Sequence, residues 1–232
     1  MMYDNTMLDN HFADLKRRHV LDDKYLDSAR VAIEDAIEII DQNDGIVNKR
    51  IYDAFFNGSI PRFLDVDIIV TKMYVKEYGN VILYEKFMDE LVKFLEGKKV
   101  LSITSWLGVL QYHLKKRGID IITTDFDLLP DNNRSVIIMD TMDAVRSYGK
   151  EVDYVLCANP PFLSDEPRYA IETMRKVNPN LVMIYIGEYR GGWNADYRFF
   201  DAVQHIRDTN ADGICRTFRT SITRFEGINL FK

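Results

Sequence analysis

The sequence predicts an α/β fold with a mostly parallel sheet, preceded by a helical N-terminal segment. Three observations support this prediction. Apolar residues recur at helical spacing through roughly the first 95 residues. From residue 97 onward, strand-like and helix-like segments alternate, and such alternation places the strands in parallel with right-handed crossovers. The chain then ends with two strand-like runs that are separated by only a few polar residues.

The N-terminal part is expected to be helical. Apolar residues with a 3.6-residue period, together with helix-breaking residues at the ends, predict helices in residues 23–41, 48–60, 64–77 and 84–95. The third of these segments also alternates like a strand, and we favour a helix that Gly79 caps. We therefore expect a helical extension, residues 1–74, and an α/β domain, residues 75–232.

The α/β domain is expected to contain parallel strands and a terminal pair. Parallel strands are predicted in residues 99–103, 119–124, 135–139, 154–157 and 181–186. Helices are predicted between them in residues 108–116 and 167–176, and after the last of them in residues 196–207. The last two strand-like runs, residues 214–219 and 223–231, lie too close together for a crossover helix. An antiparallel pair at the edge of the sheet is therefore expected.

Composition excludes several classes of protein. Thirty Lys and Arg against 36 Asp and Glu give a net charge of -6, so nucleic acid could bind only through a local patch. Cys157 and Cys215 lie in hydrophobic runs without the spacing of metal ligands, which predicts buried thiols and no metal site. Met1 is followed by acidic and polar residues, and no apolar window approaches about 18 residues. We expect a cytoplasmic protein with no membrane partner.

The most informative motif is Asn159-Pro160-Pro161-Phe162, which follows the fourth predicted strand. Ligands of open α/β sheets bind at the carboxyl ends of the strands. The Asn159 side-chain oxygen and the Pro160 carbonyl can accept hydrogen bonds from an amino group. Two prolines keep the loop rigid, and Phe162 offers a flat face for stacking. The motif therefore predicts a site that orients a planar amino-bearing group.

This tetrapeptide resembles the Asn/Asp-Pro-Pro-aromatic motif of S-adenosylmethionine-dependent amino-methyltransferases, which act on N6 of adenine or on a glutamine side-chain amide. Residues 181–200, with Gly187-Glu188 and Gly191-Gly192, are similar to a segment of a sparsely characterised methyltransferase-like group from protists, plants, fungi and large viruses. The resemblance covers about residues 75 to 231. It implies a class I methyltransferase, or Rossmann-like, fold and S-adenosyl-L-methionine as cofactor.

The resemblance also implies roles for individual residues. Asn159, Pro160, Pro161 and Phe162 would form the catalytic loop that orients the acceptor. The cofactor would be held by residues at the ends of the first three strands and in the loops after them, namely Ser102, Thr104, Trp106, Gly108, Asp125, Phe126 and Asp143. Asp125 would bind the ribose hydroxyls, Phe126 would pack on the adenine, and Asp143 would bind its amino group.

The chain departs from the family in the loop after the first strand. Of the expected Gly-x-Gly-x-Gly pattern only Gly108 is present, with Thr104 and Trp106 at the other two positions. Glycines there let the backbone approach the ligand closely. The Trp106 indole could fill the cofactor pocket, or it could cover the adenosine or the substrate base by stacking.

Three functions are consistent with the sequence. The first is methyl transfer to an amino nitrogen, with adenine N6 in DNA or RNA as the acceptor. The second is a catalytically inactive methyltransferase fold that serves as a binding or structural subunit, as in a viral assembly in the host cytoplasm. The third is methylation of a protein amide. Nucleic acid through a local patch and a protein bound to the N-terminal helices are the expected partners.

Overall fold

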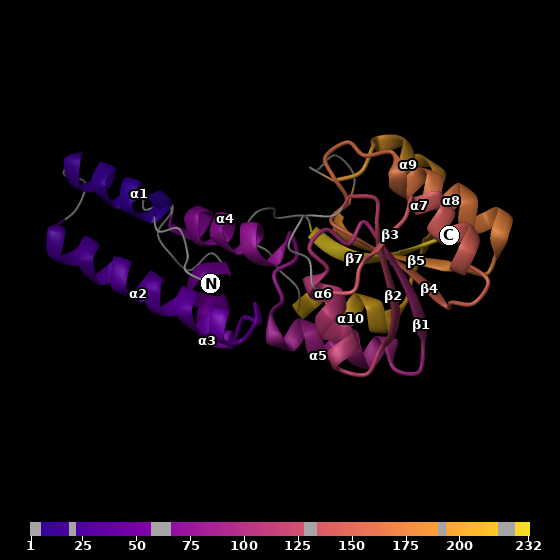
Figure 1. Ribbon diagram of the computed structural model, residues 1–232, viewed down its shortest axis with the longest axis horizontal. Helices are drawn as coiled ribbons and strands as arrows, with labels where there is room; N and C mark the ends of the chain where they lie inside the picture. Colours follow the sequence, from indigo (N-terminus) through magenta and orange to yellow (C-terminus); the bar gives the residue numbers. More distant parts are fainter. Residues whose placement is uncertain (1–5, 19–21, 57–65, 128–133, 190–193, 218–225) are drawn as a thin grey trace.

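The fold is built on a seven-stranded sheet with the strand order β3-β2-β1-β4-β5-β7-β6 (Figure 1). The computed structural model describes residues 6–18, 22–56, 66–127, 134–189, 194–217 and 226–232. In these residues the strands are β1 (Lys99–Ile103), β2 (Asp120–Asp125), β3 (Ile137–Ile138), β4 (Tyr154–Ala158), β5 (Val182–Glu188), β6 (His205–Ile206) and β7 (Glu226–Phe231).

Strands β1 to β5 are parallel, and β7 runs antiparallel between β5 and β6. The register between β1 and β4 pairs Ser102 with Leu156 and Ile103 with Cys157. The carboxyl ends of β1 and β4 therefore meet at one edge, where the loops after them can share a ligand. This α/β arrangement, parallel with an antiparallel end, confirms the predicted fold class.

Helices cover both faces of the sheet. Since successive side chains of a strand point to opposite faces, each strand contributes to two hydrophobic cores. One face packs on α5 (Glu85–Leu95), α6 (Val109–Lys116) and α10 (Thr209–Thr217), and the other packs on α7 (Thr141–Tyr148), α8 (Glu166–Val177) and α9 (Tyr197–Ala202). In β4, for example, Leu156 belongs to the first core and Cys157 to the second. Both residues are fully buried.

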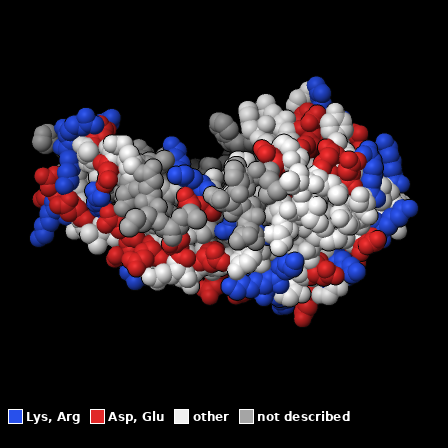
Figure 2. All heavy atoms as spheres, in the orientation of Figure 1, with Lys and Arg blue, Asp and Glu red and all other residues white. Residues whose placement is uncertain are grey.

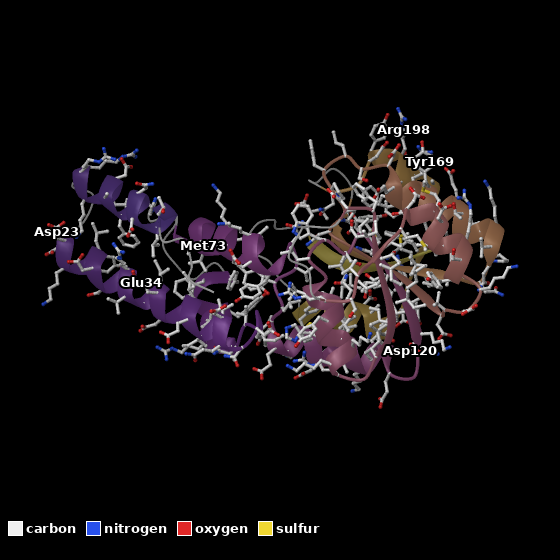
Figure 3. The ribbon with its side chains drawn as sticks, viewed as in Figure 1. Asp23, Glu34, Met73, Asp120, Tyr169 and Arg198 are labelled. Atoms are coloured by element: carbon white, nitrogen blue, oxygen red, sulfur yellow. The ribbon has the colours of Figure 1, made fainter. Side chains whose placement is uncertain are left out.

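The N-terminal part contains α1 (Thr6–Arg17), α2 (Asp23–Gln42), α3 (Lys49–Ile51), the π-helical turn η1 (Tyr52–Phe56) and α4 (Val66–Tyr78). These elements lie to one side of the sheet (Figure 1). Their buried side chains continue the core that covers the α5 face. Figure 3 labels Asp23 at the far end of this part and Tyr169 and Arg198 at the opposite end of the molecule.

Several predicted elements are confirmed within a few residues. The helix predicted in residues 23–41 is α2, the ambiguous segment 64–77 is helical from Val66 as α4, and β1 has the predicted bounds. The helix predicted in residues 48–60 is observed as α3 and η1 up to Phe56, and its remainder lies outside the described residues.

The end of the chain differs from the prediction. The helix predicted for residues 196–207 stops at Ala202, and His205–Ile206 form β6. The strand predicted for residues 214–219 is wrong, because Ile214 lies in α10, whose buried Ala211 and Ile214 pack at helical spacing. Residues 218 and 219 lie outside the described part. The antiparallel partners of β7 are therefore β5 and β6.

Charged residues of both signs are interspersed on the face that Figure 2 shows. This distribution agrees with the modest net charge of -6. Within the described ranges, no helix combines the length and the apolar character needed to cross a membrane.

Candidate functional site

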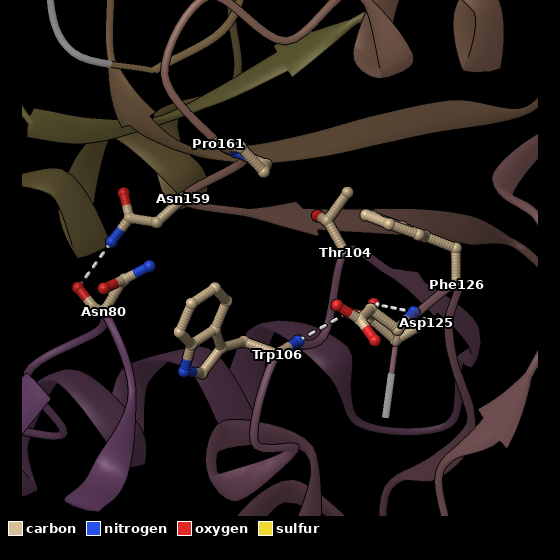
Figure 4. A pocket seen from close by; sticks show the side chains of 8 residues that line it. Asn80, Thr104, Trp106, Asp125, Phe126, Asn159 and Pro161 are labelled. Atoms are coloured by element: carbon tan, nitrogen blue, oxygen red, sulfur yellow. Dashed lines mark hydrogen bonds between the residues drawn. The ribbon is translucent and has the colours of Figure 1, made fainter. Parts of the chain in front are cut away.

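A cavity of about 130 Å³ lies at the carboxyl edge of the parallel strands (Figure 4). Its described lining consists of Asn80, Thr104, Trp106, Asp125, Phe126, Asp127, Asn159 and Pro161. These residues come from the segment before α5 and from the loops after β1, β2 and β4. Separate parts of the chain that the sequence singled out therefore meet around one cavity.

The loop after β1 keeps the backbone conformation of a glycine-rich turn. Thr104, Trp106 and Gly108 have φ angles of 52°, 51° and 67°. Left-handed φ angles are uncommon for residues with a side chain and are genuine outliers for β-branched or bulky ones. Each such residue costs on the order of 1 to 2 kcal/mol. The backbone is therefore left-handed at all three positions where the resemblance implies glycine, while two of these positions carry side chains.

Trp106 stands at the centre of this arrangement. Its indole is 49% exposed, and a Cβ atom at Gly79 would lie 3.6 Å from its Cδ1. Trp106, Asn80 and Thr104 also line a second cavity of about 20 Å³ next to the first. The indole thus lies between the two cavities. It does not fill the main cavity, which extends beside Asp125.

Asp125 closes one side of the cavity and is 7% exposed. The Trp106 N–H donates to its Oδ2 at 2.7 Å, and the Asp127 N–H donates to its Oδ1 at 3.0 Å. Each carboxylate oxygen can accept further hydrogen bonds. Phe126 follows directly with an exposed ring that lines the same cavity. A carboxylate beside a flat apolar face fits a ribose with its attached base.

Asn159 lies opposite, with a φ angle of 45°. Its Nδ2 donates to the Asn80 carbonyl at 2.6 Å (Figure 4). This contact fixes the amide orientation, because the flipped amide would place two oxygens together. Among the described residues, no donor contacts its buried Oδ1. The Asn159 side chain is 7% exposed, so the unpaired oxygen is a strong acceptor held in place.

The rest of the Asn159–Phe162 loop is held from the side of α9. Asn194 Nδ2 donates to the Pro160 carbonyl at 3.0 Å, which leaves that oxygen one lone pair. The Asp196 N–H donates to the Ser164 carbonyl at 2.8 Å. Pro161 lines the cavity, whereas Phe162 projects outward and is 58% exposed. The loop thus presents a rigid edge to the cavity and an exposed ring beside it.

Ser102 does not line the cavity, although the sequence placed it among the cofactor residues. Its fully buried hydroxyl accepts hydrogen bonds from Gln111 Nε2 at 2.8 Å and from Ser105 Oγ at 3.1 Å. Because Gln111 belongs to α6 and Ser105 to the loop after β1, these contacts connect that loop to the helix. Gly108 provides the N-cap of that helix.

Asp143 also lies away from the cavity lining. It is in the first turn of α7, where its exposed carboxylate accepts from Arg146 Nη1 at 2.6 Å. No helix was predicted for these residues; α7 begins directly after Asp140, which caps it by accepting from the Met142 N–H at 2.9 Å. The structure therefore brings together Thr104, Trp106, Asp125, Phe126, Asn159 and Pro161, but not Ser102 or Asp143.

Glu166 was not expected from the sequence. It begins α8, directly after the Asn159–Phe162 loop, and its buried Oε2 has no partner among the described residues. Burial, and next the negative charges of Asp125, Asp140 and Asp165, raise its pKa to about 7. Burial also raises the pKa of the neighbouring Cys157 thiol to about 12, so that cysteine is not a nucleophile.

Asn80 and Asn194 were missed as well. Both act on the loop after β4, Asn80 through a main-chain carbonyl and Asn194 through its side chain. A main-chain contact leaves no signal in the residue type, so Asn80 could not have been found from the sequence. As for metals, the part of the chain that the structure describes holds no group of three or more His, Cys, Asp or Glu suited to bind one.

Neither a protein-family model nor a curated protein matches the chain. Among solved structures, a mutant of MtNAS is similar with 14% identity and a TM-score of 0.42, over 69% of this chain and 62% of that one. Magnesium protoporphyrin IX methyltransferase (ChlM) from Synechocystis PCC 6803 with bound SAM has 14% identity and a TM-score of 0.39, over 63% and 76%.

The SAM-dependent methyltransferase from Agrobacterium tumefaciens is similar with 16% identity and a TM-score of 0.36, over 62% of this chain and 59% of that one. In these two comparisons, with the MtNAS mutant and the Agrobacterium protein, the chain spans under two thirds of the other protein's length. The likeness concerns the fold alone. The strand order, with the antiparallel β7 next to β5, agrees with the class I methyltransferase, or Rossmann-like, fold class that the sequence predicted.

Proposed function

We propose that the protein transfers a methyl group from S-adenosylmethionine to an amino nitrogen held at the Asn159–Phe162 loop. One observation carries the proposal. The left-handed loop of Thr104, Trp106 and Gly108 shares a cavity with Asp125 on one side and the Asn159 amide on the other. A cofactor site and an acceptor site would therefore adjoin.

The residues present fit the adenosyl end of the cofactor. Asp125 would accept hydrogen bonds from the ribose hydroxyls, Phe126 would cover the base, and Thr104 would line the path between the two sites. The cofactor, when bound, supplies an electrophilic methyl group. The cavity of about 130 Å³ is smaller than typical ligand pockets of about 300 Å³ or more. We therefore propose that the half-exposed Trp106 indole moves when the cofactor binds.

The acceptor side follows from the unpaired oxygen of Asn159. That oxygen is buried in the structure; once the site opens, it would accept a hydrogen bond from the acceptor amino group and so turn its nitrogen lone pair toward the cavity. The second lone pair of the Pro160 carbonyl would accept another. No strong base is required, because the proton can leave after methyl transfer. A planar exocyclic amine such as adenine N6 in DNA or RNA fits this edge, with Phe162 as a stacking face.

Transfer of a labelled methyl group tests the proposal. We would incubate the protein with labelled S-adenosylmethionine and single-stranded DNA, RNA or a glutamine-containing peptide. Label should enter a nucleic acid, and Asn159→Ala should lower the rate by at least about 100-fold by misorienting the acceptor. The matched control Asn180→Ala, at an exposed position far from the cavity, should retain the rate. Label only in the peptide would instead establish amide methylation.

The second candidate is a catalytically inactive fold, and the position of Trp106 favours it. An indole between the two cavities could bar the cofactor permanently. The wild-type protein would then fail to bind S-adenosylmethionine at millimolar concentration, while Trp106→Gly would bind it. Saturable binding by the wild-type protein would exclude this candidate.

A further inference from the structure

We propose that Tyr74 and Tyr78 of α4 are positioning residues that set the geometry of the site from the helical N-terminal part. This inference rests on the proposed function, because it gives Asn159 the role of orienting the acceptor. The two tyrosines hold the segment of residues 79–83, which we call the wall segment, in which Asn80 lines the main cavity and Gly79, Asn80 and Val81 line the smaller one. Neither tyrosine lines the main cavity, although Tyr78 borders the smaller one, so their effect on Asn159 passes through that segment.

The wall segment contacts both groups on which the chemistry depends. The Asn80 carbonyl accepts the hydrogen bond that orients the Asn159 amide. Gly79, its neighbour, lies beside the Trp106 indole, with the nearest atom 3.6 Å from where a Cβ would be. A displacement of this segment by a fraction of an ångström would therefore move the acceptor amide and the indole together.

Tyr74 holds the far end of the segment. Its buried hydroxyl donates to the Gly45 carbonyl at 2.8 Å and accepts from the Leu83 N–H at 3.0 Å. Leu83 is fully buried, so its N–H requires a protein partner. The Leu83 carbonyl in turn accepts from the Val47 N–H at 3.0 Å. One phenol thus bridges the loop after α2 and the wall of the cavity.

Tyr78 holds the near end. Its hydroxyl donates to Asp41 Oδ1 at 2.8 Å. Its ring lies against Gly45, where an added Cβ would be 2.4 Å from the Tyr78 Cδ1 atom. The φ angle of Gly45 is +90°, a conformation that also requires glycine. Because the ring is clamped between Asp41 and Gly45, the next residues, Gly79 and Asn80, leave α4 in a fixed direction.

These contacts account for the way in which the helical part meets the sheet. Residues 41–47, which end α2 and follow it, bind the wall through Tyr74, Tyr78 and Leu83. They also bind α6, since the Asp44 carbonyl is 2.8 Å from His113 Nε2. The N-terminal helices are thus connected to the residues that orient Asn159 through two phenol hydroxyls and through the main-chain contact of Val47 with Leu83.

The test removes each hydroxyl without changing the ring. Each variant, Tyr74→Phe or Tyr78→Phe, would be combined with Trp193→Phe. Of the two tryptophans in the chain, only Trp106 then remains. We expect the rate of methyl transfer at saturation to fall about tenfold, while the KM for the acceptor changes less than about threefold. Acrylamide quenching of Trp106 fluorescence should change in both variants. Tyr148→Phe, a half-buried tyrosine on α7, serves as the control.

The two readouts separate the inference from the proposed function. Fluorescence quenching needs no cofactor, so it reports on the wall even if the wild-type protein transfers no methyl group. Both phenylalanine variants matching Tyr148→Phe in quenching and in rate would overturn the inference. If one variant fails to fold, the other decides alone, because each hydroxyl holds a different end of the wall. Absence of transfer by the wild-type protein, with altered quenching in the variants, would refute only the proposed function.

Discussion

Replacement of Trp106 by glycine tests how the chain departs from an ordinary cofactor loop. Trp106 has a φ angle of 51°, and glycine relieves about 1 to 2 kcal/mol of backbone strain there. The half-exposed indole buries on the order of 125 Å², worth about 3 kcal/mol at about 25 cal/mol per Å². The added freedom of glycine in the unfolded chain costs about 0.4 to 1 kcal/mol more. We therefore expect a net loss of about 2 kcal/mol in the free energy of unfolding.

Binding should change in the opposite direction. The indole lies between cavities of about 130 and 20 Å³, and its removal joins them. If the indole loses half of its burial energy when it moves aside, cofactor binding to the wild-type protein is weakened by about 1.5 kcal/mol, or about tenfold in affinity. The glycine variant does not have this cost. We expect Trp106→Gly to bind S-adenosylmethionine at least about tenfold more tightly than the wild-type protein.

Urea unfolding and isothermal titration measure the two effects separately. Trp106→Phe is the control, because it retains a ring and the left-handed backbone. A variant that is less stable and binds more tightly would show that the indole occupies ligand space. Equal or weaker binding by Trp106→Gly would refute this reasoning and would identify the indole as a stacking partner of the ligand.

Three further predictions follow from the contacts of single residues. Asp125→Asn should lower the free energy of unfolding by about 1.5 to 3 kcal/mol, because two N–H groups lose a charged acceptor; Asp120→Asn, exposed on the same strand, should change it little in the same urea titration. The pKa of Glu166, about 7 against an ordinary 4.5, means that the folded state binds more protons between these values, so stability falls as pH rises through that window. Glu166→Gln should remove this fall, which amounts to about 1 to 2 kcal/mol after allowance for solvent screening. If the free energies of unfolding of the wild-type protein and the variant changed in parallel with pH, the raised pKa of Glu166 would be contradicted. Gly45→Ala should destabilise the protein by at least about 2 kcal/mol in thermal unfolding, since its Cβ would overlap Tyr78. The control Gly118→Ala, with open space at a φ of +88°, should cost only about 1 kcal/mol. Equal losses in the two variants would show that the Tyr78 contact is not needed.

The parts of the fold that depend on local periodicity could be predicted from the sequence. The α2 helix has apolar positions at 3.6-residue spacing over its whole length, and β1 is a buried apolar run between polar ends. The last elements could not, because residues 214–219 form a short segment of mixed apolar and polar side chains that fits either a strand or a helix. Asp208 gave an overlooked signal: its Oδ1 accepts from the Asn210 N–H at 2.8 Å and so caps α10.

The candidate site likewise has a part that the sequence could predict and a part that it could not. Asp125, Asn159 and Pro161 stand at strand ends, where an α/β sheet places ligands, so their convergence could be predicted. The left-handed backbone at Thr104 and Trp106 could be suspected only through the resemblance, because neither residue type favours it. The role of Asn80 depends on a carbonyl, and the raised pKa of Glu166 depends first on burial and then on carboxylates that include Asp125 and Asp140. Such features become visible only when the chain is folded.

Titration of the wild-type protein and of Asp125→Asn with S-adenosylmethionine tests the central claim most directly. The cavity beside Asp125, Phe126 and the left-handed loop predicts saturable binding at one site. The asparagine variant should bind at least about tenfold more weakly, because the charged acceptor for the ribose hydroxyls is lost. No heat of binding at millimolar cofactor, in the wild-type protein and in Trp106→Gly alike, would contradict the claim.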